Sequence, residues 1–473
     1  MTDPSINPPT QPLRWARALL LLIAIKTAWF FLDARPRLFL GDSASYLLGA
    51  SSDWMPPDRS FTYPWFLRYA VMPWQSSWSL ALVQSLIGVA SAWLLWLLLR
   101  RRLGIPEWLA LSAATVFACE PAQVFYERMV MAEACGGLAL IAMFSATLEY
   151  VASGRVRWLV AMQCLGLVAV SLRMNLLPVA LAMGVLAPLV LWWESRKARP
   201  QAWRSGAHLM LAVVLLAGLH GGYRQFIAQH FGTAPAWIAR SGLMKFGLVA
   251  PLVKPEHLWA EGVSPNVLSL LRHDIHDSAE RNPQMWAPYG LADVLGFNDN
   301  AQGDALAGRI ARRALRDDPL GLVRLGLRNA ALYFDPGTYQ DRLEADAAST
   351  QQYGSEPQAL ALRVLKASIA GSESVESPAR RWFRLGSSWL LACWLALAPL
   401  ALLAWWRLRH SNRAAAGDVL LLFALGLVLG QLLFSATISF RYLHPMPAFV
   451  LIAVAVLFAP RVSTSRISMP ISG

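Results

Sequence analysis

The stretch Gly41-Asp42-Ser43-Ala44-Ser45-Tyr46 places a carboxylate shortly after the first long apolar run, which covers about residues 18–32. A carboxylate at a membrane boundary can act as a general base and take a proton from an incoming hydroxyl. Asp42 and Tyr46 stand four positions apart, so a helix through this stretch presents both on one face. The structural alternative is that Asp42 is the N-cap of a helix beginning at Ser43.

Further along the same loop, Arg59 is followed by the aromatic residues Phe61, Tyr63 and Trp65. A guanidinium group beside aromatic rings is suited to binding a substrate anion, and Arg59 and Tyr63 are therefore candidate binding residues. The alternative is an interfacial aromatic belt with a snorkelling arginine, which is the better interpretation for Trp65.

Glu133 lies within one turn of the start of the fourth apolar run. A carboxylate inside the bilayer costs about 2.5–3.5 kcal/mol on insertion scales unless it faces a cavity or a partner. We therefore interpret Glu133 as a functional residue. The alternative is an ion pair with Arg128 or Arg173 that only holds helices together.

The elements that must position these residues are membrane helices. The chain has 473 residues with 56% hydrophobic and 15% charged side chains, 21 Trp and a mean hydropathy of +0.40, which is too apolar for a soluble protein of this size. About ten runs are long enough, or nearly so, to cross a bilayer, at residues 18–32, 77–99, 106–119, 131–151, 157–171, 175–193, 205–222, 386–406, 417–436 and 442–460. The third and fifth of these runs are short.

Basic residues set the orientation of these runs, because short loops rich in Arg and Lys stay in the cytoplasm. Arg14 and Arg17 precede the first run, and Arg100 to Arg102 follow the second. Arg407 and Arg409 follow the eighth. This pattern also explains the net charge of +13 better than a nucleic-acid partner does. It places both termini inside and the loop with Asp42 outside the cytoplasm.

Arg173, Arg441 and Tyr442 lie in the outward turns of this topology, at the same membrane level as Arg59. Three cations on different helices at one level are suited to clamping a phosphate, and a lipid head group is the obvious candidate. For each arginine alone, the alternative is that its side chain only reaches the lipid head groups.

The chain divides into three predicted parts. Residues 1–222 form an N-terminal transmembrane module with the first outer loop, and residues 386–473 form the C-terminal transmembrane helices. Residues 223–385 contain no spanning run and gather most of the Asp and Asn, so we predict a mainly helical extracytoplasmic domain there. Within it, residues 304–331 have helical amphipathic spacing and are expected on the membrane surface or against the bundle.

Other chemistries are not supported by the residue patterns. The sequence contains no Gly-rich phosphate loop and no nucleotide-binding fingerprint, so a soluble nucleotide is not expected as a direct substrate. The four cysteines have no CxxC spacing, and the histidines lack helical ligand spacing. No metal site is predicted from the residues, and a divalent cation is left open as a cofactor.

Taken together, these residues resemble the GT-C glycosyltransferase superfamily, in particular its bacterial branch of protein mannosyltransferases and the lipid A aminoarabinose transferase. The resemblance comprises the outward Asp42, the Arg59…Tyr63-Pro64 pattern, Pro121 and Tyr126 before Met131-Ala132-Glu133, Arg173 before a Leu-Leu-Pro run, and Arg441-Tyr442 with Pro445 before the last run. It implies an all-α bundle of about ten transmembrane helices with an extracytoplasmic domain.

The resemblance also implies a function. Such an enzyme moves a sugar from a polyprenyl-phosphate carrier to an acceptor hydroxyl outside the bacterial cytoplasmic membrane. Asp42 would be the general base, and Glu133 would orient the sugar, the acceptor or a cation. Arg59, Arg173 and Arg441 would hold the phosphate, with Tyr46, Tyr63 and Tyr442 beside it. Many relatives have a second acid where this chain has Ser43, which weakens a metal-dependent interpretation, and some have Glu in place of Phe440.

Two other functions remain open. A transporter or flippase for a lipid-linked saccharide would use the same phosphate clamp without the carboxylate, although such proteins usually show related halves, which this sequence lacks. An oligosaccharide ligase or polymerase would transfer a whole glycan. The residues do not distinguish these donor sizes, nor the identity of the sugar, nor a lipid, glycan or protein acceptor.

Overall fold

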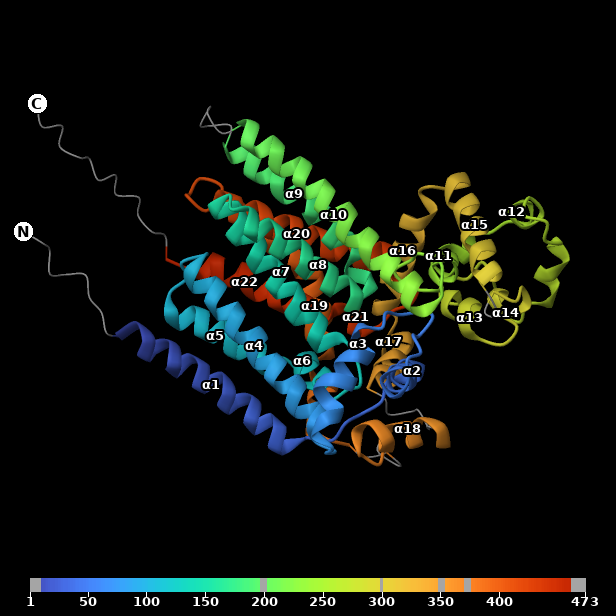
Figure 1. Cartoon of the computed structure of the whole chain (residues 1–473), viewed down its shortest axis with the longest axis horizontal. Helices are drawn as coiled ribbons and strands as arrows, with labels where there is room; N and C mark the ends of the chain where they lie inside the picture. The colour runs from blue at the N-terminus through green and yellow to red at the C-terminus, as the bar shows by residue number, and fades with distance from the viewer. Residues whose placement is uncertain (1–9, 196–201, 298–300, 348–353, 370–375, 461–473) are drawn as a thin grey trace, which may run out of the picture.

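The computed structural model describes residues 10–195, 202–297, 301–347, 354–369 and 376–460. In these residues the fold is entirely helical apart from one isolated β-bridge between Arg37 and Met129. This agrees with the predicted all-α class. Figure 1 shows a bundle of long helices with a group of shorter helices at one end.

Within the described ranges, the bundle has eight helical segments that are long and apolar enough to cross a membrane. They contain α1 (Thr10–Leu32), α4 (Ser79–Arg101), α7 (Glu133–Ser153), α9 (Leu177–Ser195), α10 (Ala202–Phe231), α19 (Pro378–Leu408), α20 (Ala414–Phe434) and α22 (Met446–Phe458). Two shorter apolar helices, α5 (Glu107–Ala118) and α8 (Val156–Leu172), pack among them. Each of the ten predicted runs is therefore a helix, and the two runs expected to be short are α5 and α8. The chain is a multi-pass membrane protein.

The segment between the first and second spans forms short pieces of helix. They are α2 (Leu40–Ser51), α3 (Thr62–Phe66) and a π-helical turn at Leu67–Val71 that continues into a 3-10 turn at Met72–Trp74. The N-cap of α2 is Phe39, and Asp42 lies in the first turn of the helix. The N-cap role considered for Asp42 is therefore wrong. The helix begins before Ser43 because the Ser43 hydroxyl accepts the Phe39 amide at 2.7 Å and donates to the Val130 carbonyl at 2.9 Å.

A second short helix, α6 (Pro121–Tyr126), leads into α7 through a buried connection. The Arg37 amide donates to the Arg128 carbonyl at 2.8 Å, and the Val130 amide donates to the Arg37 carbonyl at 2.9 Å. The side chain of Gln84 on α4 donates to the Met129 carbonyl at 2.8 Å. Because the backbone of this connection is paired on both sides, the start of α7 is fixed relative to α2 and α4.

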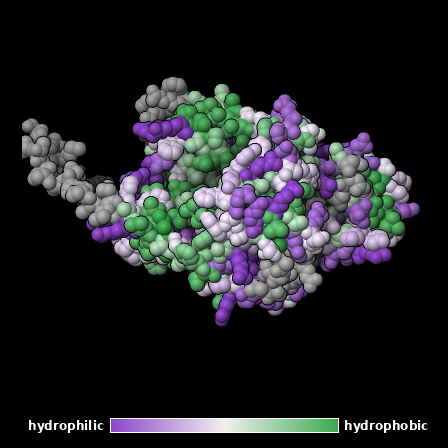
Figure 2. Space-filling view, turned by 60° about the horizontal axis from the view of Figure 1, so that its bottom comes forward, coloured by the Kyte–Doolittle hydropathy of each residue, from purple (hydrophilic) through white to green (hydrophobic). Residues whose placement is uncertain are grey.

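The remaining helices are together called the end group. They are α11 (Ser241–Val249), α12 (Pro255–Trp259), α13 (Arg281–Trp286), α14 (Leu291–Val294), α15 (Ala301–Asp317), α16 (Gly321–Ala331), α17 (Pro336–Asp346) and α18 (Ser355–Leu365). In Figure 1, α11 to α15 lie at the right-hand end of the bundle and α18 lies below α2. Helices α11 to α15 share a hydrophobic core of their own that includes Leu243, Phe246 and Ile310. Figure 2 shows hydrophobic side chains over the bundle and many hydrophilic ones toward the end group.

Three of these helices attach the end group to the bundle. Helix α16 packs on α20, where the backbone of Leu432 lies too close to Gly326 to leave space for a Cβ atom. Helix α18 packs on α2, and α17 contacts the short helix α21 (Phe440–Leu443) that precedes α22. Helix α10 continues to Phe231 and α19 begins at Pro378, so both cross the predicted boundaries at residues 222 and 385. The division into three parts stays a prediction.

Candidate active site

The carboxylate of Asp42 lies between two guanidinium groups. Arg59 Nη2 is 2.9 Å from Asp42 Oδ1, and Arg441 Nη1 binds Asp42 Oδ2. The three side chains are 17–18% exposed, so the ion pairs are largely shielded from water. Helix α2 supplies the carboxylate, the following loop supplies Arg59, and α21 supplies Arg441.

These contacts control the ionisation of Asp42. Burial raises the pKa of the carboxyl group, but the charges and hydrogen bonds of Arg59 and Arg441 outweigh burial and lower the pKa to about 2. Asp42 is therefore a carboxylate at neutral pH. Its affinity for a proton is low as long as both guanidinium groups contact it.

Aromatic side chains form one wall of this cluster. The Arg59 guanidinium lies 5.1 Å from the ring centre of Tyr46, one turn after Asp42 on α2. The rings of Tyr46 and Tyr63 meet edge to face at 4.8 Å. Tyr63 is fully buried behind Tyr46, and its hydroxyl donates to Gln84 Oε1 at 3.3 Å. On the other side, Arg441 Nη2 donates to the Tyr442 hydroxyl at 3.1 Å.

Glu133 and Arg173 join the cluster through the backbone of Arg441. Arg173 Nη2 lies 3.8 Å from Glu133 Oε1 and donates to the Arg441 carbonyl at 2.8 Å. The side chain of Arg173 crosses α7 at Gly136, where an added Cβ would come within 2.8 Å of Arg173 Cδ. Glu133 is in the first turn of α7, and both charged side chains are buried.

Of the two partners considered for Glu133, Arg173 is correct and Arg128 is wrong. Arg128 pairs instead with the preceding residue, Glu127, at 2.8 Å. Glu127 also accepts a contact of 2.6 Å from Lys26 on α1. These three charges are buried within the bundle and hold α1 against α6.

Several buried polar atoms in the cluster have no hydrogen-bond partner. They are Arg59 Nη1, Arg173 Nη1, Arg441 Nε, Glu133 Oε2 and the Tyr126 hydroxyl. A buried donor without a partner costs about 1–3 kcal/mol, and more when it is charged. Each of the three arginines thus retains a free donor, which fits the binding of an anion with several oxygen atoms.

Two residues of the cluster were not predicted as site residues. Asp58 contacts Arg59 Nη2 at 2.5 Å and shares this arginine with Asp42. Tyr126 is fully buried on α6, and burial, followed by the charges of Asp346 and Glu133, raises the pKa of its hydroxyl well above the usual value. Tyr126 was visible in the sequence as a polar aromatic residue close to Glu133, whereas Asp58 had no signal beyond its position beside Arg59.

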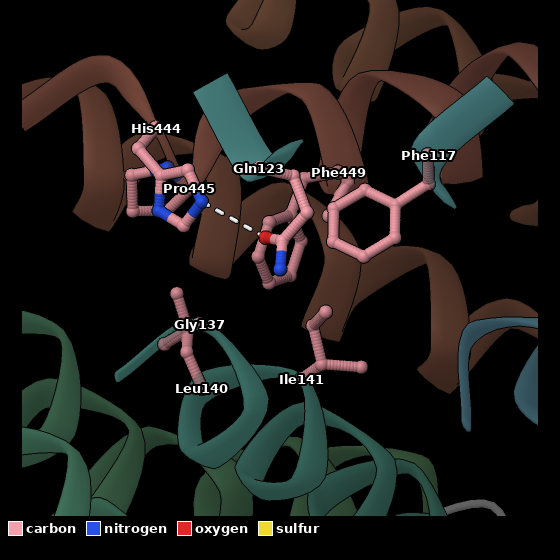
Figure 3. A pocket seen from close by; sticks show the side chains of 9 residues that line it. Phe117, Gln123, Gly137, Leu140, Ile141, His444, Pro445 and Phe449 are labelled. Carbon is pink, nitrogen blue, oxygen red and sulfur yellow. Dashed lines mark hydrogen bonds between the residues drawn. The ribbon is translucent and has the colours of Figure 1, made fainter. Parts of the chain in front are cut away.

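Two hollows lie near the cluster. One is an open groove of about 230 Å³ between α2 and α18, lined by Gly41, Ala44, Ser45, Leu48, Trp54, Glu356, Pro357 and Leu360. The other is a narrow apolar cavity inside the bundle, shown in Figure 3, with room for about one water molecule. His444 and Gln123 meet at its edge, with His444 Nε2 and Gln123 Oε1 2.9 Å apart. The predicted site residues do not line this cavity.

The groups that contact the Asp42 carboxylate are the guanidinium cations of Arg59 and Arg441. Their positive charge does not fit a metal ion bound to the same carboxylate. In the described ranges of the chain, no three His, Cys, Asp or Glu side chains are grouped as metal ligands. We derive no chemical step through a metal ion.

Comparisons with known proteins show a similarity over part of the chain. Residues 58–219 match the family model described as dolichyl-phosphate-mannose-protein mannosyltransferase. The resemblance to protein mannosyltransferases expected from the sequence is therefore confirmed over this segment, which carries Arg59, Tyr63, Glu133 and Arg173. Asp42 and Arg441 lie outside it. No protein with a curated description matches the sequence significantly.

Two solved structures are similar to most of the chain. The crystal structure of ArnT from Cupriavidus metallidurans in the apo state has 17% sequence identity and a TM-score of 0.33, with 91% of this chain and 78% of that chain covered. ArnT from the same organism bound to undecaprenyl phosphate has 17% identity and a TM-score of 0.32, with 93% and 77% covered.

Proposed function

We propose, on the premise that residues 58–219 belong with the protein mannosyltransferase family, that this chain is an integral membrane glycosyltransferase. It would move a sugar from a polyprenyl-phosphate carrier to an acceptor hydroxyl on the outer side of the bacterial cytoplasmic membrane. The observation that carries the proposal is the position of Asp42 between Arg59 and Arg441, with Arg173 joined to the same cluster. This arrangement combines a carboxylate for proton transfer with cations for a phosphate.

The reaction would be a direct displacement at the anomeric carbon. The acceptor oxygen forms a bond to this carbon, and the bond from the carbon to the carrier phosphate oxygen breaks. The phosphate oxygen keeps the electron pair, and Asp42 takes the proton of the acceptor hydroxyl. No nucleotide takes part in this step. A positioned general base contributes about a hundredfold to ten-thousandfold to such a rate.

The three arginines would stabilise the negative charge that develops on the leaving phosphate. Guanidinium groups bind phosphate oxygens through two parallel donors, and the free donors of Arg59, Arg173 and Arg441 are available for this contact. Tyr442 would support Arg441 through its hydroxyl, and Tyr46 would support Arg59 through its ring. Tyr63 would hold Tyr46 in place.

The same arginines would also control the base. With both guanidinium groups on its carboxylate, Asp42 has a pKa of about 2 and is a weak base. A donor phosphate that draws these groups to itself removes the interactions that lower the pKa of Asp42, while burial continues to raise it. Donor binding would thereby strengthen the base at the moment it is needed.

Glu133 would orient the sugar or the acceptor. Its Oε1 faces Arg173, whereas its Oε2 is buried without a partner. A carboxylate oxygen in this position can accept a hydrogen bond from a sugar hydroxyl. The groove beside Asp42 between α2 and α18 is open to the outside of the molecule and offers a route for a lipid, glycan or protein acceptor.

A flippase for lipid-linked saccharides is the second candidate, because the phosphate clamp by itself would serve binding without chemistry. The test is reconstitution of the purified protein in vesicles with a polyprenyl-phosphate-linked sugar and candidate acceptors. The proposal expects release of free polyprenyl phosphate together with a glycosylated acceptor. Movement of intact lipid-linked sugar across the bilayer, with no release of free carrier, would contradict it. The length of the transferred glycan would separate a single-sugar transferase from an oligosaccharide ligase.

A further inference from the structure

Arg441, which contacts Asp42, lies on a very short helix. Helix α20 ends at Phe434, and residues 435–439 lead into α21, which spans only Phe440–Leu443. Four residues cannot hold a fixed orientation through their own helical hydrogen bonds. Two turn residues separate α21 from α22, so the position of Arg441 depends also on contacts made by the segment that precedes it.

Asp346, at the end of α17, makes such contacts. Its side chain is completely buried, and Oδ2 accepts hydrogen bonds from the Phe440 amide at 2.6 Å and from the Ser439 hydroxyl at 2.7 Å. The N-cap of α21 is Ser439, whose own side chain makes no capping bond. Asp346 thus satisfies the first amide of α21 from a different helix, as an N-cap side chain would.

The other oxygen of Asp346 is held from its own helix. Arg342 Nη2 lies 2.6 Å from Asp346 Oδ1, one turn earlier on α17. This ion pair compensates the negative charge of a carboxylate that has no access to water.

A second residue of the end group holds the same segment. The Tyr333 hydroxyl accepts the Ser439 amide and donates to the Ser439 carbonyl, each at 3.0 Å. Gln431 on α20 adds a contact of 3.3 Å to this hydroxyl. Tyr333 and Asp346 together bind the amides of both residues that precede Arg441.

We propose that Asp346 is a positioning residue, which fixes the start of α21 so that the Arg441 guanidinium meets the Asp42 carboxylate. Asp346 acts through Arg441 and is itself no part of the catalytic machinery. The end group would then position both partners of the ion pair. Helix α17 contacts α21, which carries Arg441, and the next helix, α18, packs on α2, which carries Asp42. The functional consequence rests on the proposed function, whereas the placement of α21 does not.

The placement is tested by amide hydrogen exchange on the full-length protein in lipid nanodiscs. Asp346→Ala and Tyr333→Phe are expected to speed exchange at residues 439–441 about tenfold or more, while Glu344→Ala leaves it unchanged. Glu344 is the matched control, because it lies on the same helix and pairs with Arg384 of α19. Tyr333→Phe keeps the ring packing, so it tests the inference even where Asp346→Ala fails to fold. Unchanged exchange in the folded variants would overturn the inference.

The consequence for the site is tested by the binding of undecaprenyl phosphate, without any sugar transfer. Asp346→Ala is expected to weaken binding about tenfold to a hundredfold, as Arg441→Gln does, and Asp346→Asn is expected to recover part of this loss because its amide oxygen still accepts the Phe440 amide. The double variant Asp346→Ala/Arg441→Gln should bind like Arg441→Gln alone. Losses that add in the double variant would show that Asp346 does not act through Arg441.

The two proposals fail in different ways. If the unsubstituted protein does not bind undecaprenyl phosphate saturably, the proposed function is wrong, and the exchange experiment still decides the placement of α21. If the unsubstituted protein binds and Asp346→Ala binds equally well, the positioning role is wrong and the proposed function stands.

Discussion

Asp42 and Arg441 form an ion pair although 399 positions separate them in the sequence. One residue lies on the helix that follows the first membrane span, and the other opens the last. The pair joins segments at the two ends of the chain, and Arg59 completes it from the loop between α2 and α3. Burying these charged side chains costs free energy unless the charges compensate one another or serve a common function.

The phosphate clamp predicts that Arg441→Gln weakens the binding of undecaprenyl phosphate. The variant removes one charge-assisted contact to the anion, which corresponds to about tenfold to a hundredfold in the dissociation constant. Isothermal titration in nanodiscs measures this effect. Arg309→Gln is the control, because Arg309 pairs with Glu261 in the end group and lies outside the cluster. Equal affinity of Arg441→Gln and the unsubstituted protein would contradict the clamp.

The electrostatics of Asp42 predict a pH effect of Arg59→Gln. Burial raises the pKa of Asp42 and the two arginines lower it to about 2, so loss of one arginine moves the pKa upward. Because the base works only in its ionised form, the acid limb of kcat/KM should shift to higher pH in the variant. Transfer assays between about pH 4 and about pH 8 measure this limb. Coincident acid limbs for the two proteins would show that Arg59 does not tune the base.

Gly136→Ala tests the position of Arg173 without altering any charge. The added methyl group would come within 2.8–2.9 Å of Cδ and Cγ of Arg173, so this side chain must move away from Glu133 and from the Arg441 carbonyl. We expect about tenfold weaker binding of undecaprenyl phosphate with little loss of thermal stability. Gly218→Ala on α10 is the matched control, since a methyl group added there would have nothing within 4 Å. An effect of equal size in both variants would point to general helix perturbation.

Glu120 predicts how stability depends on pH. Burial raises the pKa of this carboxyl group from 4.5 to about 7, although the Gln123 amide donates to it at 2.6 Å. The folded protein therefore binds this proton more tightly than the unfolded chain, and stability falls as pH rises from about 4.5 to about 7. Glu120→Gln keeps a hydrogen-bond acceptor but has no carboxyl proton to lose. The free energy of unfolding of this variant, relative to the unsubstituted protein, should therefore be higher at about pH 8 than at about pH 5, by about 3 kcal/mol. Denaturation in detergent at both pH values measures the difference. A stability difference independent of pH would refute a proton held at Glu120.

Sequence patterns were sufficient for the membrane helices and for the level of the charged residues. Apolar runs define spans because the backbone must satisfy its hydrogen bonds within the bilayer, and basic loops define their orientation. The expectation that Asp42, Arg59, Arg173 and Arg441 lie at one membrane level follows from these two rules. Hence the candidate residues were found without knowledge of their partners.

The pairing of the charged side chains depends on how the helices pack, and this packing cannot be deduced from the spacing of residues along the chain. Glu133 had two possible arginine partners in the sequence, and the choice was made by Gly136, which allows Arg173 to cross α7, and by Glu127, which binds Arg128. The beginning of α2 depends on Ser43, whose hydroxyl binds a carbonyl on a distant segment. Asp346 was not identified, because its role requires that α17 lie against α21.

The central claim is that the Asp42 carboxylate takes the proton of the acceptor hydroxyl during sugar transfer. The most direct test compares the unsubstituted protein with Asp42→Asn, by mass spectrometry of acceptor and free polyprenyl phosphate after reconstitution with a lipid-linked sugar. Asparagine has a similar shape and cannot accept the proton, so the account predicts a loss of transfer rate of about a hundredfold or more in a protein that is still folded and still binds undecaprenyl phosphate. Full transfer activity in Asp42→Asn would contradict the account.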